Sequence, residues 1–100
     1  MTLAEFKRSV SRTKPPPGLA TALVALWWEA KGDGVRAHAL VMDESGMDCA
    51  WVHAYLHRVE DDIENARYWY RHAGKTPAAG QLRAEWDSIA TALLAASPSK

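Results

Sequence analysis

The stretch from Leu19 to Trp27 is apolar at almost every position and lies between two segments that break helices. "KPPPG" precedes it, and proline lacks the backbone donor that a helix interior needs. "KGDG", at residues 31–34, follows it. The pattern predicts a helix from Leu19 to about Lys31 that is apolar all round, and a helix of this kind is usually central and buried. The remainder of the chain must then cover it on every side.

The other segments also carry helical signals. Leu82, Trp86, Ile89 and Leu93 recur at helical spacing, which predicts a last helix with one apolar face. Ala, Leu, Glu and Arg are frequent, and they favour helices over strands. No segment of the sequence keeps the alternation of a half-buried β-strand. We therefore predict an all-α fold of five to six short helices.

Polar residues at the expected helix starts support this fold. Thr2 and Glu5 have the spacing of a capping box. Asp33 is predicted to cap a third helix, and Asp61 a fifth one. Gly74 suits the left-handed residue that follows a helix.

The chain has 100 residues, which is enough for one compact domain and too few for two ordinary ones. We predict an N-terminal helix and proline-rich linker over residues 1–17. A single helical domain is predicted over residues 18–96, and a disordered tail over residues 97–100.

Charge and cysteine content limit the function. Twelve basic and twelve acidic residues cancel, which argues against a nucleic-acid-binding protein, because phosphate contacts need surplus Lys and Arg. Cys49 is the one cysteine, so no intramolecular disulfide can form, as expected in a reducing compartment. The longest nearly uncharged stretch is too short to span a bilayer, and no signal-peptide core follows the N-terminus. The sequence predicts a cytoplasmic protein that contacts neither membrane nor nucleic acid.

Two segments of the chain are similar to each other at an offset of 29 residues. Residues 25–46 and 54–75 both have the pattern of a helix, a tight acidic turn and a second helix. Ala37 and Ala66 coincide early in the second helix, where a small side chain lets two backbones approach closely. Units of this kind bury their inner faces by stacking on one another.

The segments "KGDGVRAHALV" and "EDDIENARYWYRHAGKTP" resemble tetratricopeptide-type repeats. In the second segment Asp61 is near the turn, Ala66 is at the small position, Tyr70 is at the aromatic position and Pro77 is close to the terminal proline.

The first unit matches at Gly32, Asp33 and Ala37 but departs from the pattern beyond the quoted segment, at Asp43 and Glu44, where a second small residue is expected. The offset is also shorter than the usual period of about 34 residues. The resemblance implies two stacked helical hairpins plus a terminal packing helix, and it implies binding of a protein or peptide. The run "AWVHAYLHRVEDD" is also similar to stretches of small uncharacterised bacterial proteins, which implies no activity.

A second functional hypothesis concerns metal binding. His53 and His57 are four residues apart, so a helix would place both imidazoles on one face, with Glu60 in the same sector. Such a pair can chelate zinc, nickel or copper, and a carboxylate can be a third ligand. Cys49, one turn before His53, is a candidate fourth ligand. In the alternative interpretation, the two histidines pack at the edge of the core and form hydrogen bonds with backbone or carboxylate groups. The metal hypothesis predicts zinc or nickel at His53, His57 and Glu60.

A partner-binding surface is predicted from exposed aromatic and basic residues. Arg and Tyr are enriched where partners bind, and Trp residues outside the apolar stripes would extend such a surface. In the alternative interpretation, Glu64 forms ion pairs with Arg67 and Arg71 on a solvated face, and the tryptophans lie in the core. The candidate partner-binding residues are Trp28, Trp51, Arg67, Tyr68, Arg71 and His72.

The sequence contains no HExxH, GxSxG, glycine-rich phosphate loop or paired CxxC motif. We therefore predict no catalytic residues and expect a non-enzymatic module that binds a protein or peptide. Formation of a homodimer is a further expectation. The alternative function is a metal- or small-ligand-binding helical protein that uses His53 and His57.

Overall fold

The computed structural model describes residues 1–96, which form six helices and no strand. The all-α prediction is therefore confirmed. The helices are α1 (Leu3–Ser9), α2 (Thr21–Ala30), α3 (Gly34–Val41), α4 (Met47–Val59), α5 (Ile63–Ala73) and α6 (Leu82–Ala96).

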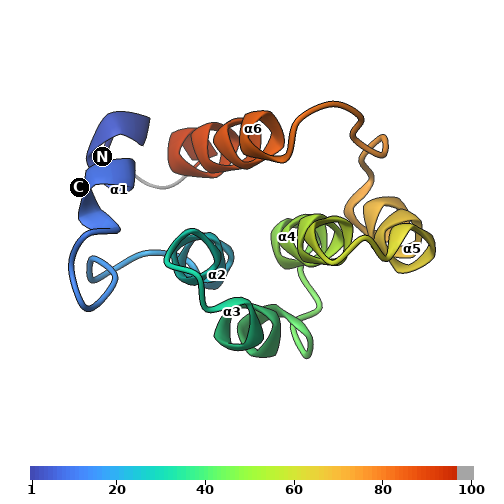
Figure 1. Ribbon diagram of the computed structural model, residues 1–100, viewed down its shortest axis with the longest axis horizontal. Coiled ribbons are helices and arrows are strands. Elements are labelled where there is room, and N and C mark those ends of the chain that lie inside the picture. The colour runs from blue at the N-terminus through green and yellow to red at the C-terminus, as the bar shows by residue number, and fades with distance from the viewer. Residues whose placement is uncertain (97–100) are drawn as a thin grey trace.

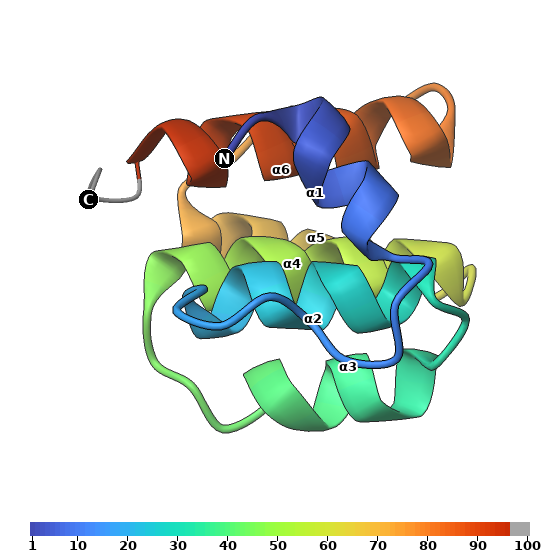
Figure 2. The same cartoon turned by 90° about the vertical axis from the view of Figure 1, so that its left-hand side faces the viewer.

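The helices are stacked in three layers. α6 lies on one side, α2, α4 and α5 form the middle layer, and α3 lies on the opposite side (Figures 1 and 2). Helices α2 to α6 run along a common direction, whereas α1 crosses α6 at an angle (Figure 2). α4 packs against α2, α3, α5 and α6, so it is the most enclosed helix. α2, the apolar helix of the sequence, packs against α3, α4 and α6.

Several helix ends form as the sequence predicts. The Thr2 hydroxyl accepts from the Glu5 backbone N–H at 3.1 Å, and the Glu5 carboxylate accepts from the Thr2 backbone N–H at 2.8 Å, which completes the capping box. The Asp33 carboxylate accepts from the Arg36 N–H at 3.0 Å at the start of α3. Gly74 ends α5 in the left-handed conformation, with φ of 70°.

The prediction that Asp61 caps α5 is wrong. Asp62 occupies the N-cap position, while Asp61 has φ of 61°. The chain needs a left-handed residue to reverse direction between α4 and α5, and aspartate tolerates this conformation better than most residues. Gly32 meets the same need between α2 and α3, with φ of 97°.

The internal similarity in the sequence coincides with similar local structure. α2 ends at Ala30 and α4 at Val59, while α3 begins at Gly34 and α5 at Ile63, so both pairs of boundaries are 29 residues apart. α2 packs on α3 and α4 packs on α5. The relation to tetratricopeptide repeats stays a prediction.

The core joins all layers through large buried side chains. Phe6 of α1 stacks on Trp86 of α6, with ring centroids 5.6 Å apart. The indole N–H of Trp27 donates to the Ser9 hydroxyl at 3.0 Å, and that of Trp86 donates to the Leu26 carbonyl at 3.1 Å. Both buried indoles thus have the partner that a buried N–H requires.

Phe6 is fully buried in the same core as α2 and α6, so α1 is packed on the remaining helices. The proposed division between residues 1–17 and 18–96 stays a prediction. The predicted tail, residues 97–100, lies outside the described residues. Within residues 1–96 no helix combines the length and apolar character required to cross a membrane.

Two alanines of α3 provide a test of this packing. Ala37 is fully buried in the core, whereas Ala39 is exposed. We expect Ala37→Leu to lower the free energy of unfolding by about 1–3 kcal/mol, because extra methylenes force neighbouring side chains apart. The matched variant Ala39→Leu should change it by less than about 0.5 kcal/mol. Urea unfolding of both variants measures the difference, and equal effects would contradict the packing of α3.

Candidate metal centre

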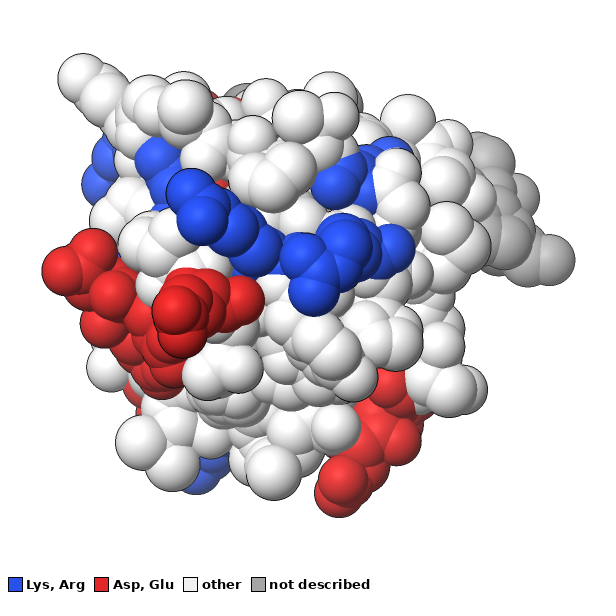
Figure 3. All heavy atoms as spheres, turned by 90° about the vertical axis from the view of Figure 1, so that its right-hand side faces the viewer, with Lys and Arg blue, Asp and Glu red and all other residues white. Residues whose placement is uncertain are grey.

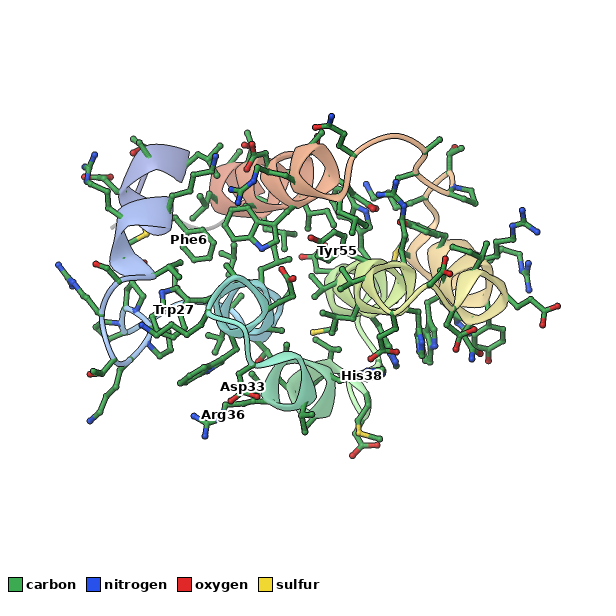
Figure 4. The ribbon with its side chains drawn as sticks, in the orientation of Figure 1. Phe6, Trp27, Asp33, Arg36, His38 and Tyr55 are labelled. Carbon is green, nitrogen blue, oxygen red and sulfur yellow. The ribbon has the colours of Figure 1, made fainter. Side chains whose placement is uncertain are left out.

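Three histidines from two helices come together at the junction of α3, α4 and α5. The spacing of His53 and His57 on α4 places both imidazoles on one face. α3 packs against this face, and His38 is directed from α3 toward α4 (Figure 4). One ring nitrogen from each histidine can be chosen so that all three lie within 4.8 Å of one another.

The three rings are in mutual contact. His38 Nε2 and His53 Nε2 are 2.8 Å apart, a hydrogen bond in which one ring donates and the other accepts. The rings of His53 and His57 are stacked, with centroids 4.9 Å apart. The His38 ring stands nearly perpendicular to both, at 4.5 and 4.8 Å.

The electrostatic environment keeps two of these imidazoles neutral. Burial, followed by the nearby His38 and His57, lowers the pKa of His53 from 6.5 to about 4. Burial and His38 also lower the pKa of His57, although Glu60 and Asp62 oppose the shift. Both rings therefore have a free lone pair at neutral pH, which a metal ligand requires.

Two carboxylates face the outer edges of the cluster. Glu60 lies 3.5 Å from His38 Nδ1 through one oxygen and 3.5 Å from His57 Nδ1 through the other. Asp62 Oδ2 is 3.6 Å from His57 Nδ1. In many metal sites a carboxylate in this position orients the imidazole and fixes its tautomer.

Among the residues that the structure describes, two buried ring nitrogens have no hydrogen-bond partner. They are His53 Nδ1 and His57 Nδ1, and the carboxylates near His57 are beyond normal hydrogen-bond distance. Only 4% of His53 is exposed, and an unpaired buried polar group costs free energy. The metal hypothesis and the alternative, in which the histidines pair with backbone or carboxylate groups, both stay predictions.

Trp69 of α5 packs against the histidine cluster. Its indole stacks on the His53 ring, with centroids 4.1 Å apart and planes at 20°. The ring of His72 contacts that of Trp69, with centroids 5.2 Å apart. His72 is not one of the three clustered histidines.

The sequence pattern found two of the three histidines. His53 and His57 were detectable because they are one turn apart on a single helix. His38 was missed because it belongs to another helix, and only the contact between α3 and α4 brings it close. Glu60 is beside the histidines as predicted, but it faces their Nδ1 atoms. Cys49 does not join the group within the described residues; it lies in the main apolar core.

The predicted partner-binding residues do not form one surface. Trp28 is on α2, where the Arg36 guanidinium covers its ring at 4.2 Å. Trp51 is on α4, where Lys75 covers its ring at 4.2 Å. The other four residues are exposed on α5: Arg67, Tyr68, Arg71 and His72.

The exposed side of α5 has a band of basic side chains (Figure 3). Arg67, Arg71 and Lys75 follow one another at four-residue intervals and are all exposed. Within residues 1–96 neither arginine forms an ion pair, so the predicted pairing with Glu64 does not occur.

Comparisons of the chain with protein-family models, with curated proteins and with solved structures give no match. The geometry of the site is therefore the basis for a functional proposal.

The lowered pKa of His53 predicts a loss of stability in acid. The unfolded chain takes up a proton near pH 6.5, whereas the folded protein does so only near pH 4. The free energy of unfolding therefore decreases progressively as the pH falls from 6.5 to about 4. The full shift of the His53 pKa corresponds to a decrease of about 3 kcal/mol.

The measurement is urea unfolding between about pH 7.5 and about pH 4, with chelator, for the wild type and His53→Phe. We expect the free energy of unfolding of the wild type to fall by up to about 3 kcal/mol more than that of His53→Phe. His72→Gln, which changes an exposed histidine, should keep the wild-type dependence. Parallel pH profiles for the wild type and His53→Phe would contradict the neutral buried state of His53.

Proposed function

We propose that this protein binds a late first-row divalent cation, Zn²⁺, Ni²⁺ or Cu²⁺, through His38, His53 and His57. The observation that carries the proposal is the convergence of three imidazoles from two helices, with ligand atoms within 4.8 Å. Imidazole is a preferred ligand for these metals, whereas Mg²⁺ and Ca²⁺ prefer oxygen.

The His38 and His53 rings need to move only slightly for both Nε2 atoms to bind one metal ion. Two nitrogens bonded at about 2.0–2.1 Å to a tetrahedral metal are about 3.3 Å apart. His38 Nε2 and His53 Nε2 are 2.8 Å apart, so the two rings need to separate by only about 0.5 Å. Trp69, stacked on His53, limits the movement of that ring.

The proton in the His38–His53 hydrogen bond can move to another ring nitrogen when a metal binds. If both rings bind through Nε2, the His38 proton moves to Nδ1, which faces Glu60 at 3.5 Å. His57 Nδ1 faces Glu60 and Asp62 in the same way, which leaves its Nε2 for the metal. This assigns the carboxylates an orienting role beside three imidazole ligands.

Three protein ligands leave a fourth coordination position for water or an external group. The side chain of His38 is 23% exposed and that of Glu60 is 52% exposed. This partly open edge supplies a path for the metal to enter.

Titration of tag-free protein with Zn²⁺ and Ni²⁺ tests the proposal. We expect about one ion per chain and a rise in the unfolding temperature, because a ligand that binds only the folded state stabilises it. His38→Ala and His57→Ala should each weaken binding by at least about tenfold, and Glu60→Gln by about 10–100-fold, as for other outer-shell groups. Calorimetry measures the affinities.

His72→Ala is the matched control, because His72 is exposed on α5 outside the cluster. It should bind metal like the wild type. Absence of binding at excess Zn²⁺, Ni²⁺ and Cu²⁺, or equal loss in His72→Ala and His57→Ala, would contradict the proposal.

A second candidate function is binding of an acidic protein segment along α5. The supporting observation is the exposed pair of Arg67 and Arg71 one turn apart on α5, neither of which forms an ion pair within residues 1–96, with the exposed Lys75 just beyond the helix end. A helix with glutamates at four-residue intervals would present carboxylates at the same spacing. Binding of a protein or peptide partner, and formation of a homodimer, stay predictions.

The second candidate can be tested with a helical peptide that carries glutamates four residues apart. We expect fluorescence anisotropy to detect binding that weakens as salt is added, because exposed charges are screened. Arg67→Glu combined with Arg71→Glu should abolish it, whereas Arg8→Glu combined with Arg12→Glu, which reverses two exposed charges at the other end of the chain, should not. Equal effects of the two charge reversals would contradict a site on α5.

A further inference from the structure

A cavity of about 420 Å³ lies on the opposite face of α4 from the histidines. Tyr55 is between His53 and His57 in sequence, so its side chain projects to the other side of the helix. In Figure 4 Tyr55 points toward α6 and His38 lies on the side of α3. Residues of α1, α2, α4 and α6 line the cavity, and its volume is in the range of small-molecule sites.

The cavity wall contains a partly buried carboxylate, Glu29, that is not paired with a basic side chain within residues 1–96. Glu29 and Tyr55 both line the cavity, and burial, followed by the nearby Glu29, raises the pKa of the Tyr55 hydroxyl. The pKa of Glu29 is raised, chiefly by burial. Retaining an unpaired carboxylate in such a place costs free energy, and a cation bound beside it would offset that cost.

The neighbouring basic residues do not fill this role. Lys7, which also lines the cavity, is paired with Asp87 at 3.0 Å. Arg58 is paired with Glu85 at 2.8 Å. Arg83 lies at the cavity but is exposed, and its influence on Glu29 is smaller than that of burial or of Tyr55.

The rest of the wall is suited to an apolar body. Trp86, Val59 and Leu82 line the cavity beside Glu29 and Tyr55. The indole of Trp86 offers an aromatic surface on which a ring or an alkyl chain can pack, and an aromatic face also attracts a cation.

We propose that this cavity binds a small organic amine in its protonated form. The ammonium group donates to the Glu29 carboxylate, and the Tyr55 oxygen in the same cavity wall is available to accept a second N–H. The apolar part of the ligand packs on Trp86, Val59 and Leu82. The site shares no ligating residue with the histidine cluster, so it is independent of metal binding.

Three probes of nearly equal shape test the requirement for positive charge. They are 2-phenylethylamine, 2-phenylethanol and 3-phenylpropionate, titrated into the wild-type protein in chelator and followed by the NMR signals of the Trp86 indole and its neighbours. We expect the amine to bind at least about tenfold more tightly than the alcohol, because a charge-assisted hydrogen bond is lost in the alcohol. The carboxylate should bind most weakly.

Variants then locate the site. Glu29→Gln should remove the preference for the amine over the alcohol, whereas Glu64→Gln, at an exposed position of α5, should keep it. Equal affinity for amine and alcohol, strongest binding of the carboxylate, or no binding of the amine would each overturn the proposal. The comparison of the three probes on the wild-type protein tests the proposal even if Glu29→Gln does not fold. Retention of the preference in folded Glu29→Gln would also overturn it.

Discussion

The structure depends on the enclosure of α4 by four other helices. α2, α3, α5 and α6 all pack against it, and the residues from Val52 to Leu56 are all buried. A helix enclosed in this way needs compatible partners on every face, yet α4 carries two histidines, a tyrosine and an arginine. The two histidines face His38 of α3, and Tyr55 lines the cavity beside α2 and α6. Arg58 pairs with Glu85 of α6. These side chains create polar positions inside the molecule.

The polar groups around α4 fall into two kinds. Arg58 shows the first kind, because its guanidinium pairs with Glu85, which also accepts from the Tyr70 hydroxyl. This network ties α4 to α5 and α6 with its donors and acceptors matched. The histidine cluster and Glu29 are of the second kind: within residues 1–96 the cluster retains two ring nitrogens without a hydrogen-bond partner, and Glu29 forms no ion pair. Groups buried without partners are costly for stability. The convergence of three imidazoles and the placing of an unpaired carboxylate in a cavity wall are the reasons for treating these two places as candidate binding sites.

The similarity of the two helical pairs also accounts for the shape of the histidine cluster. Each pair is joined by a short turn that contains one left-handed residue, Gly32 or Asp61. The turns leave Ala37 and Ala66 buried in the second helix of each pair, so the helices approach closely. The packing of α3 and of α5 on α4 then brings both His38 and Trp69 into contact with His53.

The sequence by itself determined the helical class and many local boundaries, because those depend on interactions within a few residues. The Thr2–Glu5 box, the Asp33 cap and the left-handed Gly74 are examples. It also determined that His53 and His57 share a face, since their spacing is that of one helical turn. Only the tertiary structure decided that α4 is more enclosed than the apolar α2, that His38 completes the cluster, and that Glu29 and Tyr55 line one cavity. Those contacts join residues distant in the chain, and they follow from how whole helix faces pack, which no local pattern specifies.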